Sequence, residues 1–310
     1  MSFAIEKYLE DGFQILALID RNSNTKVEIV PGKGAMLHSF TFQHQGQPLN
    51  IIDGYKDSQD YDQFVRDSFK NVKLSPFACR VQDASYTWEE QAYKIEKTSI
   101  HGLLFDVNFD LISEDADAAS ATVQLRHDYK ATDAGYPFAF SCQVQYRLSA
   151  GNQLQVTTVI VNQSGQSIPI VDGWHPYFST GTPVDDLELR FACTGILEFN
   201  DKLIPTGKTL PEDRFTELKS LKDISLDNSF LLDFSKPQPL CTIYDPVKKI
   251  NINFYPAASY PILQIYTPPH RKSIAVENLS GAPDAYNNGI HLVKLAANER
   301  KEFSTIIEVK

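Results

Sequence analysis

The sequence predicts an all-β fold: a large antiparallel β-sandwich with a few short helices. Three observations lead to this fold class. Many short segments carry an apolar residue at every second position, which places the apolar side chains on one face of a strand. Turn-forming residues separate these segments at intervals of roughly 8–12 residues. The chain also shows neither a regular alternation of strands with helices nor an internal repeat of roughly 20–50 residues.

The clearest alternation lies in the middle of the chain. Strands are predicted at residues 105–111, 123–129, 142–148 and 154–160, where apolar and polar side chains alternate. Residues 149–152 read Ser-Ala-Gly-Asn and favour a turn, which predicts a hairpin from the last two strands. The same alternation predicts further strands nearer both ends, at residues 13–19, 26–29, 37–42, 49–51, 241–244, 250–255, 262–266 and 303–309.

Helical spacing is rare. One short helix is predicted where Asp60 can cap the N-terminus and Pro76 can end the helix, with an apolar face made of Tyr61, Phe64, Val65, Phe69 and Val72. A weaker pattern predicts a second helix at residues 212–221. Because the composition does not change along the chain and no low-complexity linker divides it, we expect residues 1–310 to form one domain.

Composition and charge exclude several classes of protein. Of the 310 residues, 42% are apolar and 22% are charged, as in ordinary globular proteins. The net charge of −10, without a local run of Lys and Arg, argues against nucleic acid as a partner. No apolar run approaches the ~20 residues that span a bilayer, and residues 1–10 lack the apolar core of a signal peptide. We therefore expect a cytoplasmic protein without membrane contact.

The remaining signals are local. The four cysteines form no CxxC motif and are predicted to be free, buried thiols: Cys79, Cys142, Cys193 and Cys241. The chain has no GxGxxG, Walker, HExxH or GxSxG motif. No two of the seven histidines stand three or four positions apart, so no local metal site is predicted.

Four sequence contexts are unusual. His101 stands directly before a glycine, and His175 lies in an aromatic cluster bounded by Gly and Pro. Glu277 ends an apolar run before a turn-rich segment, and Tyr136 belongs to an aromatic loop that reads Gly-Tyr-Pro-Phe. Each context alone has an ordinary structural explanation. By themselves, these residues indicate only an all-β protein with aromatic loops that could bind a sugar.

The order of these contexts along the chain carries more information. Residues 74–81 read Leu-Ser-Pro-Phe-Ala-Cys-Arg-Val, 100–102 read Ile-His-Gly, 135–137 read Gly-Tyr-Pro, 174–178 read Trp-His-Pro-Tyr-Phe, 227–230 read Asp-Asn-Ser-Phe and 276–278 read Val-Glu-Asn. This series resembles the aldose 1-epimerase (galactose mutarotase) family over about residues 25–308. The two histidine contexts and the late glutamate are its most specific parts.

The resemblance implies a fold and a reaction. Members of that family are large antiparallel β-sandwiches, in agreement with the period-two pattern. They interconvert the α and β anomers of a free aldose, such as galactose or glucose, through the open-chain aldehyde. The implied partner is therefore a monosaccharide, bound by a monomer or a homodimer, and no metal or other cofactor is required.

The resemblance also implies catalytic roles for three residues. Glu277 would be the general base that takes the proton from the C1 hydroxyl. His175 would be the general acid that protonates the ring oxygen, and His101 would bind and polarise near the same oxygen. One carboxylate and one imidazole suffice for ring opening, because one proton leaves O1 and one reaches O5.

Five further residues are expected to bind the substrate: Arg80 and Asp227 by holding hydroxyl groups, and Trp174, Tyr177 and Tyr136 by covering the apolar face of the sugar. The sequence departs from the family pattern beside them. Cys79 stands where an Asn commonly precedes the arginine, and the glycine-rich stretch after the first histidine keeps only Gly102. These segments also show no clear pair of basic residues like the phosphate site of hexose-6-phosphate mutarotases.

Two other functions stay open at this point. A non-catalytic sugar-binding or sensing protein would keep the pocket without opening the ring. A glycoside hydrolase or lyase on a similar sandwich would normally need two carboxylates beside the scissile bond, whereas the matched motifs supply only Glu277.

Overall fold

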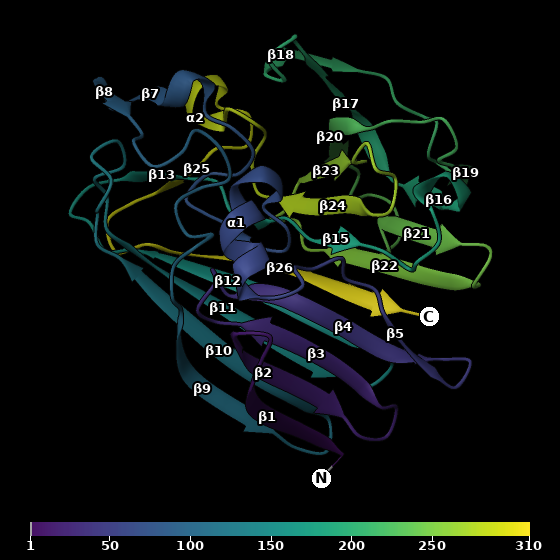
Figure 1. Ribbon diagram of the computed structural model, residues 1–310. Helices are drawn as coiled ribbons and strands as arrows, with labels where there is room; N and C mark the ends of the chain where they lie inside the picture. The colour runs from purple at the N-terminus through teal and green to yellow at the C-terminus, as the bar shows by residue number, and fades with distance from the viewer. Residues whose placement is uncertain (1) are drawn as a thin grey trace.

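The computed structural model describes residues 2–310 (Figure 1). Three antiparallel sheets make up most of it. The first is a meander of five strands, each paired with the next: β1 (Phe3–Glu10), β2 (Phe13–Asp20), β3 (Thr25–Val30), β4 (Met36–His44) and β5 (Gln47–Asn50).

The second sheet has nine strands. In spatial order they are β19 (Lys219–Ser220), β16 (Glu188–Phe191), β21 (Cys241–Asp245), β22 (Ile250–Pro256), β26 (Arg300–Val309), β12 (Gln153–Asn162), β11 (Phe140–Ser149), β10 (Ser120–Tyr129) and β9 (Asp110–Ala116). The C-terminal strand β26 lies between β22 and β12, so this sheet joins distant parts of the chain.

The third sheet has eight strands. Its path is β18 (Pro205–Leu210), β17 (Cys193–Phe199), β20 (Asp227–Leu232), β23 (Ile262–Tyr266), β24 (Ile274–Leu279), β14 (Gly173–Trp174) and β6 (Lys73–Leu74), and β15 (Tyr177–Phe178) also pairs with β24. Two smaller pairs are β13 (Ile168–Ile170) with β25 (Val293–Leu295), and β7 (Ser85–Trp88) with β8 (Gln91–Lys94). The helical elements are α1 (Ser58–Ser68), α2 (Ala285–Asn288) and the 3₁₀ turns at Gln82–Ala84 and Val184–Asp186.

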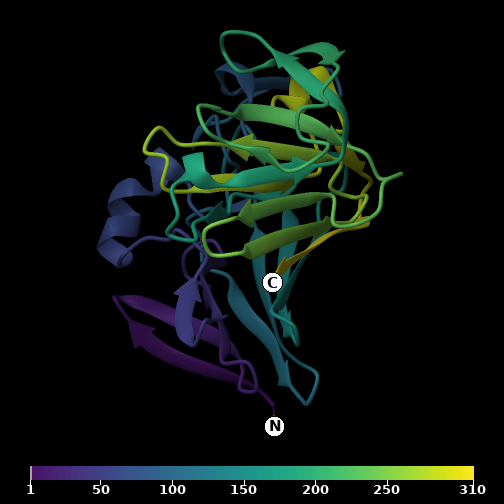
Figure 2. The same ribbon diagram turned by 90° about the vertical axis from the view of Figure 1, so that its right-hand side faces the viewer.

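The nine-stranded sheet is the layer that the other two sheets share. The five-stranded sheet packs against it at β9, β10 and β11, and Figure 2 shows these two layers facing each other near the N-terminus. The eight-stranded sheet packs against another part. Phe178 of β15 meets Phe254 of β22 edge to face at 5.0 Å between ring centroids, and Asn278 of β24 accepts a hydrogen bond from Thr305 of β26. The predicted antiparallel sandwich is therefore confirmed.

Most of the predicted strands are also confirmed. The segments at residues 123–129, 142–148 and 154–160 lie within β10, β11 and β12, and β11 and β12 form the predicted hairpin. The predicted strands nearer the ends overlap with β2, β3, β4, β5, β21, β22, β23 and β26.

The strand predicted at residues 105–111 is wrong for most of its length. β9 begins only at Asp110, and residues 105–109 are irregular. Phe105 and Phe109 are nevertheless buried. The segment runs against α1, where the Tyr61 hydroxyl donates a hydrogen bond to the Phe105 carbonyl at 2.7 Å. The burial of these two rings comes from loop packing and not from a strand ladder.

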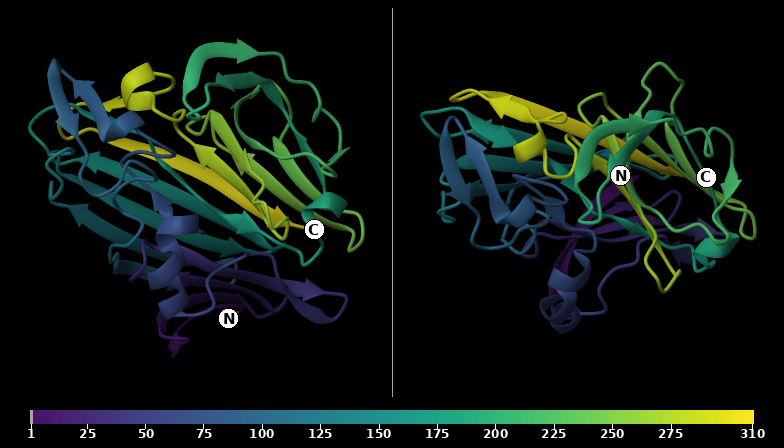
Figure 3. Two further views of the ribbon diagram at one scale, coloured as in Figure 1. Left: turned by 45° about the horizontal axis from the view of Figure 1, so that its top comes forward. Right: turned by 90° about the horizontal axis from the view of Figure 1, so that it is seen from above.

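The first predicted helix exists, with different ends. Asp57 and not Asp60 caps α1, because its carboxylate accepts a hydrogen bond from the Asp60 backbone N–H. The helix ends before Phe69, whose left-handed conformation (φ 49°) interrupts it. Val72 and Pro76 therefore lie beyond α1, which Figure 3 shows on the outside of the molecule.

The second predicted helix, at residues 212–221, does not form. That segment consists of turns, extended residues and the short strand β19. Within it only Phe215 and Leu221 are buried, and their spacing does not produce the apolar face that holds a helix against a core.

Two further expectations concern the chain as a whole. Among residues 2–310, no helix is both long and apolar enough to cross a bilayer. All four cysteines are free; three are buried, while Cys193 is half-buried.

Candidate active site

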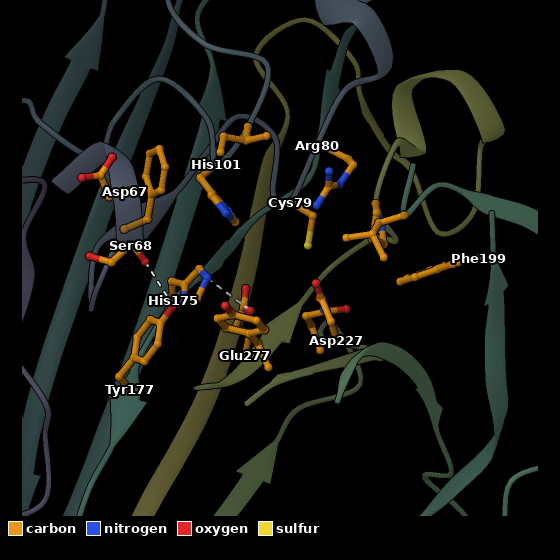
Figure 4. A pocket seen from close by; sticks show the side chains of 16 residues that line it. Asp67, Ser68, Cys79, Arg80, His101, His175, Tyr177, Phe199, Asp227 and Glu277 are labelled. Carbon is orange, nitrogen blue, oxygen red and sulfur yellow. Dashed lines mark hydrogen bonds and ion pairs between the residues drawn. The ribbon is translucent and has the colours of Figure 1, made fainter. Parts of the chain in front are cut away.

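A pocket of about 250 Å³ brings together most of the predicted site residues. It lies beside β20, β23 and β24 of the eight-stranded sheet and is closed by loops from distant parts of the chain (Figure 4). The predicted residues that line it are His101, His175, Glu277, Arg80, Asp227 and Tyr177.

Glu277 is held in the middle of β24. Successive residues of a strand point to opposite faces, so Asn278 faces the nine-stranded sheet, where it accepts the hydrogen bond from Thr305, and Glu277 faces the pocket. The Glu277 side chain is nearly inaccessible, at 1% exposure, and its Oε2 has no hydrogen-bond partner among residues 2–310. A buried carboxylate oxygen without a partner is costly, so this atom is suited to accept a hydrogen bond from a ligand.

A chain of hydrogen bonds between β20 and β23 orients Asp227. Gln264 donates from Nε2 to Asp227 Oδ1 at 2.9 Å, and Ser229 donates from its hydroxyl to Gln264 Oε1. In the strand register Ser229 lies opposite Gln264, which lies opposite Glu277. All of these polar side chains therefore share the pocket face of the sheet. Burial raises the pKa of Asp227, and the nearby Arg80 guanidinium opposes that rise.

The position of His175 is set by Asn71. His175 lies between β14 and β15, and both of these strands pair with β24. The Asn71 backbone N–H donates to the His175 carbonyl at 2.8 Å, and its side-chain oxygen accepts from the Tyr177 N–H at 2.8 Å. The Tyr177 ring stacks on the imidazole, with centroids 4.9 Å apart and planes 5° apart. One ring face of His175 is thus covered.

A left-handed turn brings His101 to the pocket. His101 and Gly102 have φ angles of 61° and 78°. A Cβ at position 102 would lie 2.4 Å from the Ser75 carbonyl oxygen, so only glycine fits there. The His101 N–H donates to the Cys79 carbonyl at 2.7 Å, and its ring packs edge to face against His175 with centroids 4.9 Å apart. The Ile-His-Gly sequence therefore has a direct structural reason.

Burial governs the protonation of the carboxylate and the imidazoles. His175 Nε2 lies 3.5 Å from Glu277 Oε1, slightly beyond an ordinary hydrogen bond. Burial lowers the pKa of His175 to about 4, while burial and then the charge of Asp227 raise the pKa of Glu277 well above its usual range. Burial, His175 and Arg80 lower the pKa of His101. Near neutral pH the environment therefore favours uncharged histidines and a protonated Glu277.

Arg80 reaches the pocket from the segment after β6. Among residues 2–310, its guanidinium makes no hydrogen bond or ion pair with another side chain, so its donors are free to bind a ligand. Cys79 precedes it and also lines the pocket. Burial, followed by the charges of Glu277 and Asp227, raises the pKa of the Cys79 thiol, which keeps it uncharged.

Two predicted binding residues lie outside the pocket, and the expectation for both is corrected. Trp174 is buried in the hydrophobic core; as the neighbour of His175 it points to the other side of the chain. Tyr136 is also fully buried, and its hydroxyl donates to the Pro169 carbonyl at 2.8 Å. Neither ring is available to cover a sugar in this pocket.

Several residues of the site were not predicted from the sequence. Gln264 carried a usable signal, because it is the one polar residue in the apolar core of β23. Asn71 gave no such signal in the sequence, because the residues that it positions, His175 and Tyr177, lie far along the chain. The same holds for Asp67, Phe199 and Leu203, which line the pocket from α1 and the β17–β18 hairpin. No group of three or more His, Cys, Asp and Glu side chains within residues 2–310 is arranged to hold a metal ion.

Solved structures share this fold over nearly the whole chain. The protein superimposes on galactose 1-epimerase from Lactobacillus acidophilus with a TM-score of 0.82 at 18% identity, covering 99% of this chain and 98% of the other. A galactose mutarotase-like protein from Clostridium acetobutylicum gives a TM-score of 0.86 at 16% identity, covering 100% and 99%. At these identities the likeness concerns the fold alone.

Comparisons of the sequence with known proteins identify the family of this chain. The chain is 24% identical over 247 residues to a maltose epimerase from Levilactobacillus brevis, covering 72% of this chain and 71% of that protein. It is 25% identical over 238 residues to the uncharacterized protein YihR of Escherichia coli, covering 73% and 74%. Residues 16–308 match the aldose 1-epimerase family itself, which is almost the full length. The chain therefore belongs to the aldose 1-epimerase family.

Proposed function

We propose that this protein is a mutarotase that interconverts the α and β anomers of a free aldose, such as galactose or glucose, by acid–base ring opening. The observation that carries the proposal is the pairing of a buried carboxylate with a buried imidazole at 3.5 Å in a ligand-sized pocket. In the part of the chain that the structure describes, each of the two groups has a polar atom without a hydrogen-bond partner. Membership of the aldose 1-epimerase family supports the class of reaction.

The geometry suits the chemistry of a hemiacetal. Its C1 carries both O1 and the ring oxygen O5, so two oxygens separated by one carbon can contact two adjacent protein groups. Glu277 takes the proton from O1 while His175 gives a proton to O5, the C1–O5 bond breaks and the aldehyde forms. Rotation about C1–C2 presents the other face of the carbonyl. The reverse transfers then close the ring as the other anomer and restore both protein groups.

Substrate binding must move one proton from the Glu277 carboxyl group to the His175 imidazole. Without a bound sugar the environment favours a neutral His175 and a protonated Glu277. Ring opening instead needs the Glu277 carboxylate and the His175 imidazolium. A sugar hydroxyl that donates to Glu277 stabilises its charged form, and the adjacent imidazolium does the same. Both groups then operate with pKa values shifted toward the working pH, which favours efficient proton transfer in either direction.

The remaining pocket residues hold and orient the sugar. Arg80 offers several N–H donors, and Asp227, fixed by Gln264, offers acceptors. His101 lies beside His175 and can bind near the same ring oxygen. The Tyr177 ring stacks on the His175 imidazole and keeps the plane of that imidazole fixed during the reaction.

Polarimetry tests the proposal. Freshly dissolved α-galactose and α-glucose change their optical rotation slowly on their own, and the protein should speed the approach to the same final rotation. Heat-denatured protein is the control. No acceleration with any common aldose would overturn the proposal. If calorimetry then showed tight sugar binding, the protein would be a sugar-binding protein on this fold.

One observation favours a second candidate, a glycoside hydrolase. The pocket contains Asp227 as well as Glu277, and the charge of Asp227 is near enough to raise the pKa of Glu277. Two carboxylates are the usual requirement for glycoside hydrolysis. A reducing-end assay on oligosaccharides decides between the two functions, because a mutarotase creates no new reducing ends.

A further inference from the structure

The pairing of two short strands with β24 places His175 opposite Glu277. β14 pairs with β24 at Leu279, β15 pairs with β24 at Ala275, and both pairs belong to one register. The same register, continued through the residues between the two strands, puts His175 directly opposite Glu277. Side chains of directly opposed residues lie on one face, with Cβ atoms about 4.5–5.5 Å apart. The 3.5 Å contact between the imidazole and the carboxylate therefore depends on this register.

Few ladder bonds specify this register. β14 and β15 are each 2 residues long, and so is β6, which pairs with β14 on its other side. Pro176 lies between β14 and β15 and has no backbone N–H to donate. A slip of one residue would turn every side chain to the opposite face, so the hydrophobic pattern excludes it. A slip of two residues keeps each side chain on its own face, and the hydrophobic pattern does not exclude it.

A buried ion pair occupies the face of these strands that points away from the pocket. Lys73 of β6 lies opposite Trp174. Its Nζ donates to Asp172 Oδ2 at 2.7 Å and to the Gly173 carbonyl at 2.7 Å. The Tyr260 hydroxyl donates to the same carboxylate oxygen at 2.7 Å. We call Lys73, Asp172 and Tyr260 the core triad, because all three side chains are buried.

The core triad joins the segment before His175 to its neighbours. The Asp172 N–H donates to the Ser280 hydroxyl at 2.8 Å, and the Asp172 carbonyl accepts from the Ser280 N–H at 2.8 Å. Tyr260 stacks on Phe303 of β26, with ring centroids 5.7 Å apart. Asp172 is thus tied to β6 through Lys73, to β24 through Ser280 and to the nine-stranded sheet through Tyr260.

The charges of the core triad distinguish the observed register from one slipped by two residues. In the slipped chain, Ile170 or Trp174 would take the place of Asp172 beside Lys73, and the buried ammonium would lose its counter-charge. Leaving one charge of a buried ion pair uncompensated is strongly destabilising. An apolar contact at the same place discriminates less, because apolar side chains of similar volume replace one another at small cost.

We propose that Lys73, Asp172 and Tyr260 are positioning residues, which specify the strand register that holds His175 opposite Glu277. The inference rests on the proposed mutarotase function, because the register aligns the proposed acid with the proposed base. None of the three residues lines the pocket, so they act through His175. Fixing a register that apolar packing leaves open is the best-attested use of buried ionic groups.

The test replaces the core triad by apolar side chains of similar shape. The triple variant Lys73→Met/Asp172→Leu/Tyr260→Phe leaves no charge behind in the core, and such replacements often keep a protein folded. We expect a cooperative urea transition but a kcat for mutarotation that is lowered by about tenfold to 10²-fold, because a misplacement of about 1 Å can cost that much. KM should change less, since Arg80 and Asp227 do not belong to the displaced segment.

A second measurement reports the position of His175 and needs no activity. An NMR titration follows the imidazole signals of His175, which the additional substitution His175→Asn identifies by their loss. Burial lowers the pKa of this imidazole to about 4 in the wild type. In the triple variant we expect the pKa to move toward the ordinary value of 6.5, because a displaced imidazole leaves its buried site.

The five-stranded sheet offers a matched control. There the Lys26 ammonium lies 2.6 Å from the Glu28 carboxylate, which also accepts a hydrogen bond from the Tyr8 hydroxyl. These residues are of the same three kinds as the core triad, and their strands β1 and β3 belong to a different sheet from the strands beside His175. Lys26→Met/Glu28→Met/Tyr8→Phe should keep the wild-type kcat and the wild-type pKa of His175.

The possible outcomes can be told apart. A folded triple variant with wild-type kcat and wild-type His175 pKa overturns the positioning role and leaves the mutarotase function standing. An equal loss of kcat in the control variant also overturns it, because the effect would then be a general loss of rigidity. If the wild type accelerates the mutarotation of no aldose while the triple variant alone shifts the His175 pKa, the positioning role stands and the mutarotase function fails.

A milder variant covers the case in which the triple variant does not fold. Asp172→Asn keeps the shape of the side chain and an acceptor for Tyr260, but it removes the counter-charge of Lys73. We expect the same two changes, a lower kcat and a His175 pKa nearer to 6.5. Wild-type values of both in Asp172→Asn would overturn the positioning role.

Discussion

Replacing Glu277 by glutamine tests the proposed base. The amide keeps the shape of the side chain and one acceptor oxygen, but it cannot take a proton from O1. Catalysis by a positioned acid or base typically contributes about 10²–10⁴-fold, and each tenfold change corresponds to about 1.36 kcal/mol of barrier. We therefore expect Glu277→Gln to lower kcat by at least about 10², which is about 2.7 kcal/mol of lost transition-state stabilisation.

The same substitution should leave the fold intact. Glu277 is 1% exposed, and burial and Asp227 raise its pKa well above the ordinary value of 4.5. A group with a raised folded-state pKa contributes stability below its unfolded pKa, and this contribution is lost as pH rises through the folded pKa. Glutamine does not titrate. Urea unfolding should therefore find Glu277→Gln more stable than the wild type at alkaline pH, with the difference shrinking as pH falls to the ordinary carboxyl pKa.

A double-variant cycle tests whether the carboxylate and the imidazole act together. His175→Asn removes the proposed acid and should also lower kcat by at least about 10². The two losses should combine less than additively, because both groups serve one proton relay. Polarimetry corrected for the spontaneous rate measures all three variants. Near-wild-type turnover in Glu277→Gln would refute the proposed base, and full additivity would refute the relay.

The remaining predictions concern binding, cofactors and stability. Arg80→Ala should mainly raise KM, by about tenfold, because its proposed contacts with hydroxyls exist in the ground state and in the transition state; a fall in kcat alone would contradict this role. Mutarotation should survive exhaustive treatment with EDTA, since the proposed transfers use side chains only, and recovery on adding a divalent ion would move the protein to another mechanism. Lys73→Met should lower the free energy of unfolding by about 3–5 kcal/mol, because the Lys73 ammonium lies 2.7 Å from the buried Asp172 carboxylate; a urea titration that shows less than about 1 kcal/mol would refute the importance of this pair. Stability should also fall as pH drops from 6.5 toward about 4, because burial lowers the pKa of His175 from 6.5 to about 4. His175→Asn should lose this part of the acid sensitivity, which urea unfolding at pH 6.5 and at about pH 4 measures.

The sequence by itself determined the fold class and most of the strands. Residues in β10, β11 and β12 alternate because one face of each strand is buried and the other is not, and that difference is written directly in the residue types. The unusual contexts of His101, His175 and Glu277 were also visible, because a glycine-dependent turn, an aromatic cluster and a carboxylate at the end of an apolar run are local features.

Tertiary structure decided what alternation and local context leave undetermined. Residues 105–109 alternate like a strand because period two records only which residues are apolar, and a loop that buries Phe105 and Phe109 beside α1 produces the same pattern. Trp174 and Tyr136 are aromatic residues of the kind that can cover a sugar, but only the packing shows that their rings face the core. The roles of Asn71 and Gln264 depend on segments far apart in the chain. Their geometry follows from sheet register and loop packing, which no short stretch of sequence encodes.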